Sequence, residues 1–305
     1  MLKNLINSYY DDNKNNKYEM QYLDLIRDII QEGSLEEGRN GITYTVIGAS
    51  MYFDLKNNTI PLLTTKKVAW KTCLKELLWF VKGQTDNTIL MEQKCNIWKG
   101  NASREFLDSR NLQHLKENDL GPVYGHQWRF FNAKYTDCHT DYSGQGFDQL
   151  QYIINNLKDP KERTSRRLVL SAWNPYQINE MALPPCHILV QFNVTKGNRL
   201  SASMYQRSGD IGLGVPFNIA SYSFLTYLIA KHCDLEVESF NYHIGNAHIY
   251  DDHVDVLKKQ IERIPYEFPK LNILRKRENI NDYVLEDFEI IDYKFHPTIK
   301  MNMRI

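Results

Sequence analysis

Leu183-Pro184-Pro185-Cys186-His187 begins the segment from which the fold class follows most directly. Residues 187–194 and 199–205 after it are rich in Leu, Val, Phe and Met, and the turn signal Lys196-Gly197-Asn198 separates them, which predicts two strands. Cys186 is therefore expected to start a strand. The second strand runs into Tyr205-Gln206-Arg207-Ser208, so one segment pairs a candidate thiolate with an arginine that can bind an anion.

Outward from this stretch, apolar side chains recur at helical spacing. Residues 217–232 are apolar on nearly every face, which suits a central helix buried on all sides. Residues 22–30 and 68–81 carry helical apolar stripes, and Glu76 falls inside the second of them, where a carboxylate needs a reason. Residues 167–173 form another strand pattern. No repeat, linker or composition break interrupts residues 22–303, so we predict a single α+β domain.

Composition and charge narrow the class of protein. Of 305 residues, 42% are hydrophobic, which is enough for a large core, and 37 basic residues balance 37 acidic ones. This balance argues against nucleic acid as the main partner, although a local arginine cluster can bind RNA weakly, and it favours a small anionic ligand. The five cysteines are scattered and unpaired in spacing, which predicts reduced thiols in the cytoplasm, with Cys73, Cys95, Cys138 and Cys233 as inert core residues.

The N-terminal segment differs from the rest of the chain. Residues 8–17 are almost wholly polar, so we predict a flexible tail over residues 1–17 and a folded domain over residues 18–305. The apolar start, Met1-Leu2-Lys3-Asn4-Leu5-Ile6, is too short for a signal peptide, and no later apolar run reaches the ~18 residues of a membrane span. Secretion and membrane insertion are not expected.

Several longer strings match one family in order and separation. They include Pro61-Leu62-Leu63-Thr64-Thr65-Lys66, Gly121-Pro122-Val123-Tyr124-Gly125, Gly214-Val215-Pro216-Phe217-Asn218 and His248-Ile249-Tyr250, besides the cysteine and arginine segments above. On these strings the chain resembles the thymidylate synthases. The resemblance implies a large twisted mixed sheet, covered by helices on one face and packed against a second subunit on the other. It also implies reductive methylation of dUMP with 5,10-methylenetetrahydrofolate as co-substrate, without a metal.

The resemblance assigns roles in catalysis and in substrate binding. Cys186 would attack C6 of the uracil ring, Glu76 and Tyr124 would move protons, and Asn218 would pair with uracil rather than cytosine. The phosphate would be bound by Arg39, Arg207 and Ser208, together with Arg166 and Arg167 contributed to the site of the partner subunit. The remaining substrate-binding positions implied are Gln206, Asp210, His248 and Tyr250.

The folate site is likewise implied by resemblance. It comprises Ile97, Trp98, Asn101, Asp210, Leu213, Phe217, Met303 and Ile305. These side chains would exclude water from the reacting one-carbon unit. If water reacted before hydride, the product would be hydroxymethyl-dUMP, so a dUMP hydroxymethylase stays open as an alternative, as does an inactive dimer that binds nucleotide or RNA.

The chain departs from the family pattern at three positions that bear on the site. The loop after Arg39 is one residue shorter than usual, and Asn246 stands where an aspartate is common. Arg304 precedes the last residue, where a small side chain is customary, and we expect this bulky cation to loosen the C-terminal lid.

Overall fold

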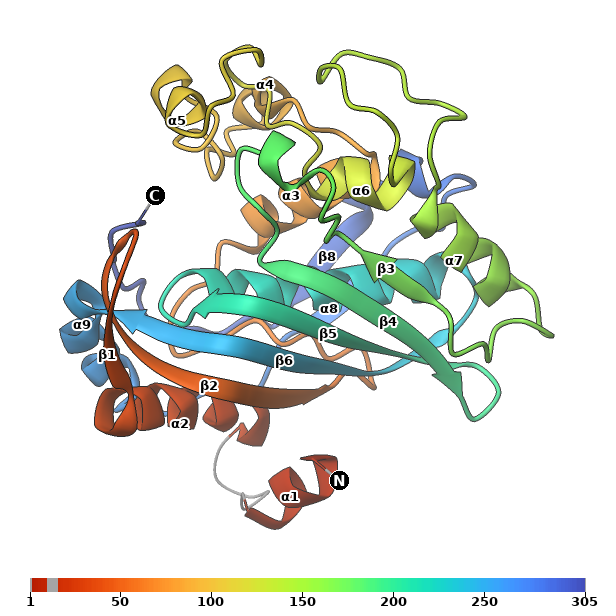
Figure 1. The fold of residues 1–305 in the computed structure, drawn as a ribbon. Coiled ribbons are helices and arrows are strands. Elements are labelled where there is room, and N and C mark those ends of the chain that lie inside the picture. Colours follow the sequence, from red (N-terminus) through yellow and green to blue (C-terminus); the bar gives the residue numbers. More distant parts are fainter. Residues whose placement is uncertain (1, 10–15, 305) are drawn as a thin grey trace.

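A six-stranded mixed sheet with the order β1-β2-β6-β5-β4-β3 is the centre of the molecule (Figure 1). The structure is a computed structural model that describes residues 2–9 and 16–304. Only β5 and β6 pair in parallel, whereas their neighbours pair antiparallel. The sheet strands are β1 (Ser34–Gly38), β2 (Gly41–Asp54), β3 (Val169–Ser171), β4 (His187–Thr195), β5 (Arg199–Asp210) and β6 (Glu236–Tyr250), and a separate hairpin pairs β7 (Lys270–Ile273) with β8 (Phe288–Ile291).

Helices surround this sheet unequally. The α-helices are α1 (Leu2–Tyr9), α2 (Lys17–Glu32), α3 (Trp70–Val81), α4 (Asn87–Glu92), α5 (Arg104–Ser109), α6 (Tyr124–Phe130), α7 (Gln149–Lys158), α8 (Gly214–His232) and α9 (Val254–Gln260), and the 3-10 helices are Ile178–Glu180, Asp251–His253, Ile280–Asp282 and Leu285–Asp287. Helix α8 runs behind β5 and β6 and is buried on nearly all sides, as predicted. Much of the opposite sheet face, toward the viewer in Figure 1, carries no helix among the described residues.

The alternation along β4 explains why one face is core and the other is open. Val190, Phe192 and Val194 are buried, whereas Leu189 just before them is 36% exposed and Gln191 and Asn193 between them are partly exposed. Successive side chains of a strand point to opposite faces, so the apolar set fixes the register of the strand against the helices. The open face thus includes the large apolar side chain of Leu189, which a face in contact with solvent would not need.

The predicted elements are confirmed in outline. The single α+β domain, the helices at α2, α3 and α8 and the strands at β3, β4 and β5 all occur. The two longest strands, β2 and β6, were not predicted. Leu2–Tyr9 is a helix, whereas the sequence suggested an unstructured tail, and the prediction of flexibility for residues 10–15 lies outside the described residues.

Among residues 2–9 and 16–304, no helix combines the length and apolarity needed to cross a bilayer.

Candidate active site

Cys186 lies immediately before β4, where the sequence predicted the start of a strand. A β-bulge between His187 and Leu189 interrupts the pairing there, and bulges redirect side chains at strand ends. The Cys186 N–H donates to the Tyr124 hydroxyl at 2.7 Å, and the thiol remains partly exposed. The nucleophile candidate is therefore held by its backbone in a partly buried position.

Arg207 holds its guanidinium beside this thiol. Its Nε donates to the Pro185 carbonyl at 2.8 Å and its Nη2 to the Pro184 carbonyl at 3.0 Å, which places Nη2 3.8 Å from Cys186 Sγ. Burial raises the pKa of the Cys186 thiol, while the charges of Arg207 and Arg39 lower it. The predicted electrostatic help is present, but without a bound substrate it does not outweigh burial.

The four arginines predicted to bind phosphate divide into two groups. Arg39 forms the turn between β1 and β2, and its charge acts on Cys186 and Tyr250, so it joins Arg207 at one site. Arg166 and Arg167 are exposed before β3. The neighbouring Leu168 pairs with Phe192, six residues beyond Cys186, which is a separation of about 20 Å along a strand. Within one chain these two arginines do not belong to the Cys186 site.

Glu76 is a partly buried acid on α3, where its helix context predicted a buried one. Helix α3 places it against Trp98, whose Nε1 donates to Glu76 Oε1 at 2.7 Å. Burial raises the pKa of Glu76 from 4.5 to about 7, and the hydrogen bond from Trp98 opposes this rise. A carboxyl group with this pKa can both give and take a proton near neutral pH.

His187 completes an aromatic group beside the thiol, and the sequence assigned it no role. Its ring stacks on Tyr124 with centroids 4.1 Å apart, and its Nδ1 lies 2.6 Å from the Tyr222 hydroxyl. Burial lowers the pKa of His187 to about 3, so the ring is neutral at physiological pH. Burial also raises the pKa of Tyr124 well above its usual value. The signal that could have found His187 is its position, one residue after the candidate nucleophile.

Strand β5 and helix α8 each contribute a polar side chain to the site. Gln206 is buried and accepts from the Tyr242 hydroxyl at 2.6 Å, while its amide donates to the Ser208 carbonyl at 2.8 Å. Asn218, in the first turns of α8, keeps a partly exposed side-chain amide. The side-chain amide of Gln206 is therefore fixed to the sheet, whereas Asn218 is partly exposed.

Asp210 and His248 meet at the end of the parallel strand pair, where their Cα atoms are register partners. Asp210 Oδ1 accepts from Gly212 N at 2.8 Å and Leu213 N at 3.3 Å, which shapes the turn into α8. His248 Nδ1 lies 3.0 Å from Asn246 Oδ1, so the amide that replaces the usual aspartate still contacts the ring. The rings of His248 and Tyr250 pack edge to face at 5.4 Å, as expected for positions two apart on one strand.

The predicted folate-binding residues lie on three segments. Ile97 and Asn101 are partly exposed on the turns around the buried Trp98, and Leu213 and Phe217 are partly exposed at the start of α8. Met303 is 52% exposed in the C-terminal segment, and Ile305 lies outside the described residues.

The C-terminal segment is bound to the end of β6. Asn302 O lies 2.8 Å from Nε2 of the buried His253, and Arg304 Nη2 forms ion pairs with Asp252 at 3.0 Å and Asp251 at 3.4 Å. The Arg304 guanidinium also lies 5.9 Å from the Tyr250 ring centroid. This argues against the expectation that Arg304 loosens the lid, because it has acidic partners in reach.

Lys66 is a further residue of the site to which the sequence assigned no role. Its ammonium is buried and donates to the Gly212 carbonyl, in the turn that Asp210 shapes. Burial lowers the pKa of Lys66 to about 8, against the attraction of Asp210 and Glu19. The signal was present in the string Thr64-Thr65-Lys66, which the resemblance includes.

A partly exposed thiol next to a guanidinium, with a partly buried acid and hydrogen-bonding groups around it, has the chemical groups that covalent catalysis on an anionic substrate requires. The family model for thymidylate synthase matches residues 20–305, and the chain therefore belongs to the thymidylate synthase family. It is 50% identical to the thymidylate synthase of Candida albicans and 51% identical to that of Saccharomyces cerevisiae, in both cases over 95% of this chain and 98% of the relative. It is 51% identical to a bifunctional dihydrofolate reductase-thymidylate synthase of Paramecium tetraurelia over 94% of this chain, and it spans 61% of the length of that protein.

Proposed function

We propose that this chain is a thymidylate synthase that converts dUMP to dTMP, with 5,10-methylenetetrahydrofolate leaving as dihydrofolate. The observation that carries the proposal is the contact between Cys186 Sγ and Arg207 Nη2 at 3.8 Å, in a chain of this family. A substrate phosphate bound at Arg207 would place the uracil ring of the same molecule near the thiol. One residue would then serve both binding and activation of the nucleophile.

The first chemical step is addition of the Cys186 sulfur to C6 of the uracil ring. This addition gives C5 the enolate character it needs to attack a one-carbon unit. Asn218 offers a donor and an acceptor that match O4 and N3–H of uracil and mismatch cytosine. Arg39, Arg207 and Ser208 bind the phosphate, while His248 and Tyr250 bind the sugar hydroxyl.

Proton movement is assigned to Glu76 and Tyr124. Glu76 has a pKa of about 7 and can hold a proton near O4 and release it through water. The Tyr124 hydroxyl accepts a hydrogen bond from the Cys186 N–H, and the Tyr124 ring stacks on His187. From this position the hydroxyl can help remove the C5 proton. The neutral His187 fixes the stack through Tyr222 and adds no charge to it.

The folate co-substrate would bind against partly exposed apolar side chains of the site. Ile97, Leu213 and Phe217 offer flat apolar contact, and Asp210 offers a carboxylate held by two backbone N–H groups. When bound, methylenetetrahydrofolate supplies both the one-carbon unit and the hydride. The residues around it exclude water, which is the condition for dTMP rather than hydroxymethyl-dUMP.

A second copy of the chain on the open sheet face would complete the site. Ile47 is 76% exposed and Tyr205 is 41% exposed on this sheet, and Arg166 and Arg167 lie about 20 Å from Cys186 along the strands of one subunit. Apolar exposure of this kind is typical of an interface. We assign the two arginines to the phosphate of the partner's site, in a cytoplasmic homodimer whose five free thiols suit a reducing compartment.

Subunit complementation tests this arrangement. Cys186→Ser and Arg167→Ala homodimers should each be nearly inactive. When they are dissociated and reassembled together, heterodimers should recover activity, because one of their two sites then has an intact Cys186 and an intact arginine from the other subunit. Failure to recover activity in verified heterodimers would place both residues in the same subunit's site.

Product identification separates the candidate reactions. The purified protein is mixed with dUMP and methylenetetrahydrofolate, and both products are identified by mass. Formation of dTMP with dihydrofolate supports the proposal, whereas hydroxymethyl-dUMP with tetrahydrofolate would replace it with the hydroxymethylase. Salt-sensitive RNA binding without turnover would instead favour the inactive binding dimer.

A further inference from the structure

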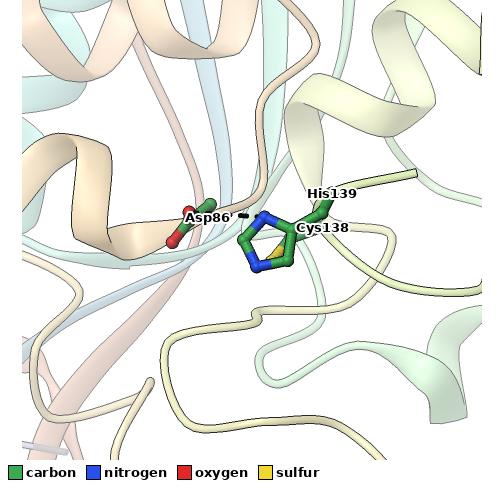
Figure 2. Close-up of side chains that lie close together, drawn as sticks. All are labelled: Asp86, Cys138 and His139. Carbon is green, nitrogen blue, oxygen red and sulfur yellow. Dashed lines mark hydrogen bonds and ion pairs between the residues drawn. The ribbon is translucent and has the colours of Figure 1, made fainter. Parts of the chain in front are cut away.

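Asp86, Cys138 and His139 bring three different metal-ligating groups together outside the active site (Figure 2). Their ligand atoms all lie within 4.8 Å of one another. His139 Nδ1 is 3.9 Å from Asp86 Oδ2, and His139 Nε2 is 3.8 Å from Cys138 Sγ. Ligand atoms around a tetrahedral zinc ion are about 3.3–3.6 Å apart, given the usual bond lengths, so only small movements separate this group from that geometry.

The loop that carries Cys138 and His139 is fixed by hydrogen bonds. The Tyr142 hydroxyl accepts from Thr136 N at 2.9 Å and Asp137 N at 3.1 Å and donates to Asp137 O at 2.8 Å. Asp137 Oδ1 in turn accepts from His139 N at 2.9 Å. The backbone under both ligands is therefore preorganised, and only the exposed His139 ring must turn to point one nitrogen at an ion.

Asp86 is held as firmly from the other side. Its backbone carbonyl accepts from Trp79 Nε1 at 3.0 Å, and its Oδ1 accepts from Thr88 N at 2.8 Å, as the N-cap of α4. Oδ2, the oxygen nearest His139, is the one left over from capping. The carboxylate can thus bind an ion without giving up its structural hydrogen bond.

The surroundings of Cys138 are acidic, and Cys138 is not the buried core residue that the sequence suggested. The Cys138 N–H donates to Asp119 Oδ2 at 3.0 Å, and Tyr135 donates to Asp119 Oδ1 at 2.7 Å. The carboxylates of Asp119, Asp86 and Asp137 therefore place negative charge around the sulfur. A divalent cation bound at Cys138 would offset this charge.

We propose that Asp86, Cys138 and His139 bind a zinc ion, one per chain. Sulfur, imidazole nitrogen and carboxylate oxygen together suit Zn²⁺ rather than Mg²⁺ or Ca²⁺, and three protein ligands leave a fourth position for water. Binding replaces the thiol proton by the metal and releases that proton to solvent. The ion would cross-link the loop after α6 to the start of α4, so it would stabilise this part of the fold without entering the reaction at Cys186.

Cobalt substitution tests the site directly. Chelator-treated full-length protein is titrated with Co²⁺, and the thiolate-to-cobalt charge-transfer absorption is followed. We expect a band that saturates at one Co²⁺ per chain and disappears when Zn²⁺ is added. Cys138→Ser should remove the band, His139→Ala should weaken binding by at least about tenfold, and Asp86→Asn, which keeps the cap, should weaken it less than His139→Ala does.

Matched controls exclude adventitious thiol or imidazole binding. Cys186→Ser removes the other partly exposed thiol, and His114→Ala removes an exposed histidine outside the group, so both should keep the band. The zinc ion should also raise the melting temperature of the wild type and leave that of His139→Ala unchanged, a variant on an exposed side chain that retains the fold. Absence of the band, or its loss in Cys186→Ser and retention in Cys138→Ser, would overturn the proposal.

Discussion

Two partly exposed cysteines of this chain have neighbouring charges of opposite sign. Cys186 and Cys138 are both partly exposed and both sit beside a chain turn. The charges that act on Cys186 are those of Arg207 and Arg39, whereas the charges that act on Cys138 are those of Asp119, Asp86 and Asp137. Exposure makes a thiol available, and the sign of the neighbouring charges decides whether it suits attack on an anionic substrate or capture of a cation.

The other three cysteines show what happens without exposure. Cys73, Cys95 and Cys233 are buried, and burial is the first cause of the raised pKa at each of them. Their burial confirms the predicted core position for three of the four cysteines, and Cys138 is the exception. The informative comparison is therefore between Cys186 and Cys138, and four experiments can test it.

Replacement of the sulfur should have the largest effect. Cys186→Ser should lower dTMP formation by at least about 10⁴-fold, the usual cost of losing a covalent nucleophile, while circular dichroism stays that of the wild type. Cys138→Ser is the matched control, and it should retain turnover. Substantial product from Cys186→Ser, or an equal loss in Cys138→Ser, would break the contrast.

Alkylation compares the two thiols in one sample. At pH 8, iodoacetamide should modify Cys186 faster than Cys138, because the cations beside Cys186 favour its thiolate and the carboxylates around Cys138 oppose it. Arg207→Gln should slow the reaction of Cys186, since the loss of the cation raises its pKa further, and should leave the rate at Cys138 unchanged. Peptide mass spectrometry after digestion gives both rates, and faster modification of Cys138 would contradict the assignment of charges.

Glu76 in the Cys186 site makes the stability of the fold depend on pH. Its pKa is about 7 in the folded chain and 4.5 ordinarily, so the folded state holds a proton between these values that the unfolded chain has lost. Stability from this group is present below pH 4.5 and is lost as the pH rises through about 7. The loss is at most on the order of 3 kcal/mol, from 1.36 kcal/mol per pKa unit.

Urea unfolding of Glu76→Gln at several pH values measures this loss. The amide cannot ionise, so the variant should become more stable relative to wild type as the pH rises from 5 to 8. Turnover should fall at the same time, because Gln cannot move a proton. Glu105→Gln is a matched control on an exposed helix position, and an identical pH profile for the two variants would show that burial of Glu76 has no energetic effect.

Elements that follow from local sequence patterns were predicted, whereas features that depend on contacts between distant segments were not. The buried helix at 217–232 and the strands flanking Lys196-Gly197-Asn198 follow from apolar spacing and one turn, so they were predicted. Strands β2 and β6 were missed because they pair with each other across most of the chain, with Thr45 opposite His248. The exposure of Cys138 likewise depends on segments distant in sequence, since Asp86 and Asp119 reach it only after folding.

Site residues that lie in a recognisable motif were predicted. Residues whose place in the site depends on packing between distant segments were missed. Cys186, Arg207 and Glu76 lie in recognisable strings, and the structure brings Cys186 and Arg207 into contact. For Arg304 the sequence shows a bulky cation but not its acidic partners, so its effect on the lid stays a prediction. Asp251 and Asp252 directly follow Tyr250 and are distant from Arg304 in the sequence. Only folding brings the C-terminal segment into contact with them.

The smallest expected effect concerns this C-terminal contact, a feature that the Cys186 site has and the Cys138 site lacks. An exposed ion pair contributes about 0.2–1 kcal/mol, so Arg304→Ala should raise the KM for methylenetetrahydrofolate by about two- to fivefold and should increase any hydroxymethyl by-product. Added salt should raise the wild-type KM toward that of the variant, because salt screens the pair. Lys300→Ala removes another exposed cation from the same segment and should leave the KM unchanged. If both variants behave alike, general charge rather than the contact with Asp252 attracts the folate, and the lid would then be held by His253 and the carbonyl of Asn302 alone.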